Sequence, residues 1–99
     1  MNNKLCDIYI ESIYPINNTD DEKINKTMVG KRTNEQIIRT NEELKKVAKE
    51  EQVKYVNLYD SLLDENGNLK LKYTKEGLHI SDEGYEIITD YVKKNILND

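Results

Sequence analysis

The chain has 99 residues, of which 36% are hydrophobic and 34% charged, and seven tyrosines are its only aromatic side chains. This length allows one small domain, and the low hydrophobic content leaves a modest core, which would suit a fragment that shares its core with further chain. Fifteen basic and 19 acidic residues are mixed along the chain, give a net charge of -4 and form no basic stripe, which argues against a nucleic-acid partner.

The single cysteine and the single histidine limit the kinds of site that the chain can build. Cys6 excludes an intramolecular disulfide, and its place in an apolar run predicts a buried thiol rather than a nucleophile. With one histidine and one cysteine a protein-only zinc site is not expected, and we predict neither a metal nor a cofactor. No membrane span is expected either, since no stretch approaches the roughly 18 apolar residues that one needs. The compartment, cytoplasmic or secreted, is left open.

The first predicted element is a strand over residues 6–13. This segment mixes apolar and β-branched side chains and ends before Pro15, which cannot donate to a ladder. Near the end of the strand, Glu11 and Ser12 could face a cleft or solvent, and solvent is expected. Residues 17–32 are polar, and a polar segment of this length is either a functional loop or a mobile one; we interpret it as a flexible loop.

A helix is predicted to begin at Thr33, because Thr33 and Gln36 form a capping-box pattern. Its apolar stripe comprises Ile37, Ile38, Asn41, Leu44, Val47 and Ala48. Asn41 is expected to be a buried structural residue that hydrogen-bonds to a neighbouring loop. A strand over residues 53–58 follows after a short connection. Strand, helix and strand with short connections predict a right-handed crossover and parallel pairing.

Two turns and a helix complete the chain. Asp60 and Ser61 end the second strand, and Ser61 is interpreted as a turn residue because it lacks the Gly-x-Ser-x-Gly elbow of a nucleophile. Residues 64–68 contain Asn-Gly and predict a tight turn. The last helix is predicted over residues 82–95, with Ser81 as its N-cap. Its inward side chains are predicted to be Tyr85, Ile87, Ile88, Tyr91, Val92 and Ile96.

His79 follows Glu76 by three residues, in the loop that enters this last helix. A side chain on such a loop can point out of the fold. A carboxylate beside an imidazole accepts the proton of one ring nitrogen, which fixes the tautomer, and it favours the charged ring once a proton arrives. This is the base-and-orienter half of a nucleophile–His–acid triad. The same pair also fits a surface loop in which the two side chains only cap or contact water.

The residues around this pair carry a wider pattern. Residues 73–85 read Tyr-Thr-x-Glu-Gly-Leu-His-Ile-Ser-x-x-Gly-Tyr, which resembles the last sequence block of the SGNH (GDSL-type) esterases and acylhydrolases. The usual form there is Asp-Gly-x-His, followed by Gly-Tyr on the final helix. Residues 7–17 resemble the strand and loop before the family's penultimate helix, and residues 41–59 resemble that helix and the next strand. The resemblance covers essentially the whole chain.

This resemblance implies an α/β fold, with residues 1–99 as the C-terminal portion of a single flavodoxin-like, three-layer α/β/α SGNH hydrolase domain. It also implies hydrolysis of a small-molecule ester or O-acyl group, in which His79 takes the proton of a serine and Glu76 orients the ring in place of the usual Asp. The family's Gly-Asp-Ser block, its oxyanion glycine and its Gly-x-Asn-Asp block do not occur in the sequence. The nucleophile is therefore expected from residues outside these 99, and the chain alone is expected to be inactive.

Two other interpretations remain open. The chain could be a truncated, non-catalytic fragment or an interaction module, because a two-stranded parallel sheet is a poor stand-alone domain and its open edge invites a homodimer or a swapped assembly. A small regulatory flavodoxin-like module would instead need an acidic phosphoacceptor cluster at the strand ends. Asp60 alone is weak support for that class, which also leaves Gly77-Leu78-His79 unexplained.

Overall fold

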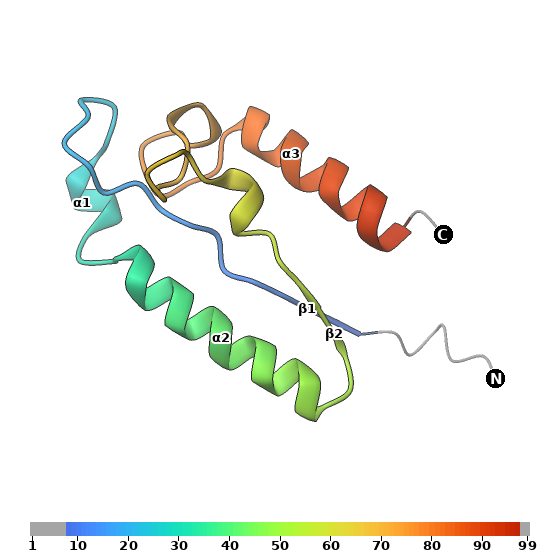
Figure 1. Ribbon diagram of the computed structural model, residues 1–99. Helices are drawn as coiled ribbons and strands as arrows, with labels where there is room; N and C mark the ends of the chain where they lie inside the picture. The colour runs from blue at the N-terminus through green and yellow to red at the C-terminus, as the bar shows by residue number, and fades with distance from the viewer. Residues whose placement is uncertain (1–7, 98–99) are drawn as a thin grey trace.

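The computed structural model describes residues 8–97 and alternates strands with helices (Figure 1). Its longer elements are β1 (Tyr9–Glu11), α1 (Lys26–Val29), α2 (Asn34–Glu50), β2 (Lys54–Val56) and α3 (Asp82–Val92). Two short 3-10 turns, η2 (Asp60–Leu62) and η3 (Leu71–Tyr73), lie between β2 and α3, and a π-helical turn, η4 (Lys93–Leu97), continues α3. β1 pairs with β2 in parallel, with Ile10 opposite Tyr55. The predicted α/β class and the predicted parallel pairing are confirmed.

β1 is shorter than predicted, and Cys6 lies outside the described residues. Glu11 is exposed as expected, but the prediction that Ser12 faces solvent is wrong, because Ser12 is buried. The Ser12 amide donates to the Val56 carbonyl over 2.9 Å, and its hydroxyl accepts from the Leu58 amide over 2.8 Å. The hydroxyl thus prolongs the pairing of the two segments beyond the last strand residues.

α2 begins at the predicted cap, where the Thr33 hydroxyl accepts from the Gln36 amide. As predicted, Asn41 is buried and ties the helix to the chain after β1, since its side chain accepts from the Ile13 amide over 2.8 Å and donates to the Ile13 carbonyl over 3.2 Å. The predicted apolar stripe is too wide. Ile38 and Val47 are 47% and 42% exposed, because within residues 8–97 the helix packs on a sheet of two strands.

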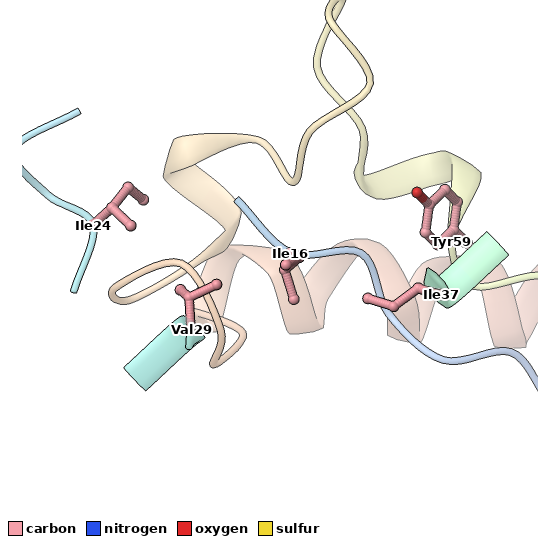
Figure 2. Packing of buried hydrophobic residues seen from close by; sticks show 5 residues of the cluster. All are labelled: Ile16, Ile24, Val29, Ile37 and Tyr59. Atoms are coloured by element: carbon pink, nitrogen blue, oxygen red, sulfur yellow. The ribbon is translucent and has the colours of Figure 1, made fainter. Parts of the chain in front are cut away.

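Residues 17–32, predicted to be a flexible loop, contain a helical turn and contribute to the core. The Asn25 side chain caps the single helical turn α1, and two apolar side chains of the segment reach the core. The main buried cluster consists of Ile16, Ile24, Val29, Ile37 and Tyr59 (Figure 2). The loop therefore supplies part of the core, which its polar composition hides. Burial raises the pKa of the Tyr59 hydroxyl, which has no hydrogen-bond partner among the described residues.

The turn predicted over residues 64–68 is confirmed. The Asp64 carboxylate accepts from the amides of Asn66 and Asn68, and Gly67 has a φ of 85°. The turn brings Leu62 and Leu69 into a second buried cluster with Ile80.

α3 begins at the predicted cap and packs on η2 and η3 rather than on the strands. Figure 1 shows α2 and α3 on opposite sides of the chain that carries β1 and β2. Only Gly84 is fully buried in α3. Ile87 and Ile88 pack half-buried on the second cluster, but the prediction that Tyr85 points inward is wrong, because this side chain is 50% exposed. No helix within residues 8–97 is long and apolar enough to cross a membrane.

Candidate active site

The loop that carries His79, residues 74–81 (the His79 loop), is closed by backbone pairing between its two ends. Thr74 and Ile80 form an isolated antiparallel bridge, and the Lys75 amide donates to the His79 carbonyl over 2.9 Å. One residue further out, the Ser81 amide donates to the Tyr73 carbonyl over 2.9 Å. The loop therefore leads straight into α3 with both of its ends fixed.

A second loop, residues 17–25, holds the His79 loop from the side. The Asn17 amide donates to the Gly77 carbonyl over 2.9 Å, and the Asn25 amide donates to the Glu76 carbonyl over 2.8 Å. Gly77 has a φ of +110°, and a Cβ atom there would lie 2.6 Å from the Asn17 carbonyl oxygen and 2.8 Å from a Val29 methyl group. Only glycine fits this close approach between the two loops.

Glu76 and His79 meet as the sequence predicts. The Glu76 Oε2 atom lies 2.9 Å from His79 Nδ1, while Oε1 accepts from the backbone amides of His79 over 2.6 Å and of Leu78 over 3.1 Å. The Glu76 side chain is 22% exposed and the His79 side chain 55% exposed. The carboxylate is therefore fixed by three hydrogen bonds, while the imidazole remains open to a partner molecule.

These hydrogen bonds lower the pKa of the Glu76 carboxyl below its usual value. The backbone amide of His79 contributes most, the His79 ring and the Leu78 amide contribute further, and partial burial opposes the shift. An ionised carboxylate that faces Nδ1 favours the tautomer in which Nδ1 carries the proton. The lone pair of Nε2 is then free to accept a proton, which is the requirement for a general base.

None of the three serines in the chain is hydrogen-bonded to His79. Ser12 is buried against the Leu58 amide, Ser81 caps α3 and donates to the Lys72 carbonyl, and Ser61 is exposed in η2. The described residues also contain no group of three His, Cys, Asp or Glu side chains that could hold a metal ion. The pair of Glu76 and His79 therefore stands without a nucleophile among the residues shown.

Sequence reasoning missed the residues that support this pair. Thr74 is fully buried and hydrogen-bonded inside the loop, while Asn17 and Asn25 hold the loop from outside. Gly77, with its positive φ, was the available signal, because a glycine between an interacting Glu and His indicates close backbone packing. The backbone that packs against Gly77, at Asn17, lies some 60 residues earlier in the sequence, and no local pattern points to it.

The α/β fold is matched by a known family of proteins. The sequence profile described as GDSL-like Lipase/Acylhydrolase matches residues 2–92. The chain belongs to the GDSL-like lipase/acylhydrolase family, which confirms the resemblance found in the sequence. None of the proteins with curated descriptions matches it.

Solved structures agree with this family and show that the chain covers part of a typical member. A protein from Streptococcus pneumonia, described provisionally as a platelet activating factor, is 35% identical with a TM-score of 0.80, over 89% of this chain and 40% of that one. A GDSL-like lipase from Bacteroides thetaiotaomicron VPI-5482 is 26% identical, with a TM-score of 0.69, over 92% and 42%. A protein from Bacteroides fragilis NCTC 9343, provisionally an acylhydrolase, is 20% identical, with a TM-score of 0.70 and the same coverages. This chain thus spans about two-fifths of their length.

Proposed function

We propose that residues 1–99 form the C-terminal portion of a single SGNH-type serine esterase or acylhydrolase domain, to which they contribute the general base His79 and its orienting residue Glu76. The observation that carries this proposal is the 2.9 Å contact between Glu76 Oε2 and His79 Nδ1, on an imidazole that is half exposed. Family membership supports the reaction class, which is hydrolysis of a small-molecule ester or O-acyl group.

In the proposed mechanism, His79 Nε2 takes the proton of a serine hydroxyl as the serine oxygen attacks the acyl carbonyl. The imidazolium then returns this proton to the leaving oxygen, and an acyl-serine remains. Water attacks the acyl-serine in the second half of the reaction, with the same ring first as base and then as acid. The Glu76 carboxylate stabilises the imidazolium in both halves. The sequence contains no Gly-Asp-Ser block, so we assign the serine and the oxyanion donors to residues beyond these 99.

A hybrid enzyme tests this assignment. This chain replaces the matched 42% of the GDSL-like lipase from Bacteroides thetaiotaomicron, and hydrolysis of p-nitrophenyl acetate and butyrate is measured. We expect activity in the hybrid, a loss of roughly a thousandfold or more with His79→Ala, and a smaller loss with Glu76→Gln. The chain alone should show no activity above its own His79→Ala variant. A hybrid that folds and hydrolyses equally well without His79 would contradict the proposal.

A second proposal concerns partners and follows from the incomplete sheet. In the described part of the chain each strand has one hydrogen-bonded neighbour, and Ile8 and Ile13, which flank β1, are 61% and 43% exposed. We propose that the isolated chain covers this edge by pairing with a second copy, as a homodimer or a swapped assembly. If the chain is instead a non-catalytic interaction module, the same edge is its binding surface.

Association can be measured by sedimentation at several concentrations. We expect the wild-type chain to dimerise and Ile8→Lys to remain monomeric with a nearly unchanged free energy of unfolding, because the side chain is already exposed. Met28→Lys is the matched control in α1, which lies at the other end of the molecule from the strand pair (Figure 1); its side chain is 40% exposed, and this variant should still dimerise. A wild-type chain that stays monomeric and melts sharply at high concentration would overturn the proposal.

A further inference from the structure

Thr74 is the most deeply buried polar residue near the candidate active site, and it does not touch the reacting groups. Its side chain is 0% exposed. The hydroxyl donates to the His79 carbonyl over 2.7 Å and accepts from the Gly77 amide over 2.9 Å. One hydroxyl group therefore joins the middle of the loop to its end. Both the donor and the acceptor capacity of this hydroxyl are used.

The two groups that Thr74 holds lie on either side of the Glu76 contacts. Glu76 must reach the amides of Leu78 and His79 with one oxygen and the imidazole with the other. This is possible only while the backbone from Gly77 to His79 keeps its conformation, because three donors together fix the position of the carboxylate. The Thr74 hydroxyl fixes both ends of that short backbone segment.

The other contacts on the loop do not fix the Gly77 amide, which only Thr74 holds among the described residues. The amides of Asn17 and Asn25 hold the carbonyls of Gly77 and Glu76. They fix the outer side of the loop against residues 17–25. Neither contact reaches the Gly77 amide, whose partner is the Thr74 hydroxyl. The His79 carbonyl keeps one further bond, from the Lys75 amide.

We propose that Thr74 is a positioning residue that sets the tautomer of the His79 ring by fixing the backbone from Gly77 to His79, whose amides hold the Glu76 carboxylate. This inference rests on the proposed function of His79 as the general base. The requirement is for a hydroxyl, since only a group that donates and accepts at once can serve both backbone atoms. Serine should therefore replace Thr74, and valine, which has the same shape without the hydroxyl, should not.

The chain allows a direct test, because His79 is its only histidine and its ring nitrogen NMR signals are unambiguous. In the wild-type chain, above the pH at which the ring is protonated, we expect the neutral ring with its proton on Nδ1. Glu76→Gln should move the proton to Nε2, because the amide group of glutamine donates to Nδ1. Thr74→Val should give a mixture of the two tautomers and raise the pKa of the Glu76 carboxyl toward its usual value. Thr74→Ser should match the wild type in both readouts.

In the hybrid enzyme, Thr74→Val should lower kcat by on the order of 10- to 100-fold with little change in KM, because the base is displaced while substrate contacts remain. Leu58→Ala is the control for a general loss of stability. Leu58 is buried, but it belongs to neither of the two buried clusters that pack near the loop. It should leave the tautomer unchanged. If Thr74→Val does not fold, Thr74→Ala gives the same readout without the added methyl group. In the wild type, the Thr74 hydroxyl proton should also exchange slowly and lie close to the Gly77 amide proton.

The outcomes separate the two proposals. A tautomer that Glu76→Gln leaves unchanged would contradict the pairing of Glu76 with His79, and with it the proposed function. A tautomer that changes with Glu76→Gln but not with Thr74→Val or Thr74→Ala would overturn the role of Thr74 alone. A fast-exchanging Thr74 hydroxyl in the wild type would also overturn it.

Discussion

The His79 loop and the strand pair are built in opposite ways. In the loop, most backbone amides of residues 74–81 donate to partners within the chain, and the neighbouring backbone at Asn17 packs directly against Gly77. In the strand pair, three residues on each strand form the ladder, and Ile8 and Ile13 are exposed. The Glu76–His79 pair is therefore preorganised by its own surroundings, while the described strand pair leaves apolar side chains uncovered.

This contrast has a physical origin. A short loop can satisfy its polar groups with its neighbours in sequence and one supporting segment, because each bond needs only a few atoms in place. A parallel sheet buries its apolar surface only when enough strands and helices lie side by side. We therefore expect loop substitutions to act fully in the chain as it stands, and substitutions at the sheet to act partly through association.

The largest effect is expected at the contact between the two loops. Gly77→Ala should cost about 3 kcal/mol in the free energy of unfolding, since it adds strain at a φ of +110° and a Cβ atom 2.6 Å from the Asn17 carbonyl oxygen. Gly67→Ala is the matched control, with a φ of +85° and nothing within 4 Å of the added atom. It should cost about 1 kcal/mol, from strain alone. Urea unfolding of both variants measures the difference, and equal losses would show that the loops do not touch.

The next effect concerns the strand side of the comparison. Asn41→Ala removes both hydrogen bonds to the Ile13 backbone and should cost about 2 kcal/mol, because it leaves a partly buried amide and carbonyl without partners. Its neighbour on the same helix provides the control: Thr40 is exposed, and Thr40→Ala should change stability by less than about 0.5 kcal/mol. Denaturant unfolding at low protein concentration checks both. A negligible loss for Asn41→Ala would mean that α2 is not anchored to the end of β1.

Helix caps on the two sides should differ by a smaller amount. Thr33→Ala removes the cap of α2 and should cost about 1 kcal/mol. Ser81→Ala should cost somewhat more, about 1.5 kcal/mol, because the Ser81 hydroxyl also donates to the Lys72 carbonyl and so joins α3 to the base of the loop. Thermal unfolding followed by circular dichroism gives both values. A larger loss for Thr33→Ala than for Ser81→Ala would argue that the bond from Ser81 to the Lys72 carbonyl adds little to the stability of the loop.

The smallest effect is the pH dependence that Glu76 contributes. Because folding lowers the pKa of this carboxyl below 4.5, the stability it adds is complete above pH 4.5 and is lost as the pH falls through the folded pKa. Glu76→Gln should therefore flatten the acid limb of the stability curve and leave its slope near pH 7 unchanged. Glu43→Gln is the control, since Glu43 pairs only with an exposed lysine at 3.5 Å. An unchanged acid limb in Glu76→Gln would contradict the hydrogen bonds seen at its carboxylate.

Much of this architecture could be read from local patterns. The caps at Thr33 and Ser81, the turn at Gly67 and the buried amide of Asn41 all follow from short-range spacing, and each is present. The errors at Ile38, Val47 and Tyr85 have one cause. A helical period shows which face is apolar, but it does not show which segments pack against that face or how much of it they cover.

The sequence by itself determined the alternation of strands and helices, the two helix starts and the nearness of Glu76 to His79, because these depend on residues a few positions apart. Only the tertiary structure decided that residues 17–25 hydrogen-bond to the His79 loop and that Thr74 is buried within that loop. It also decided that Ser12 turns inward to the Leu58 amide. Each of these depends on backbone atoms that approach from distant parts of the chain, and no local period or propensity records such an approach.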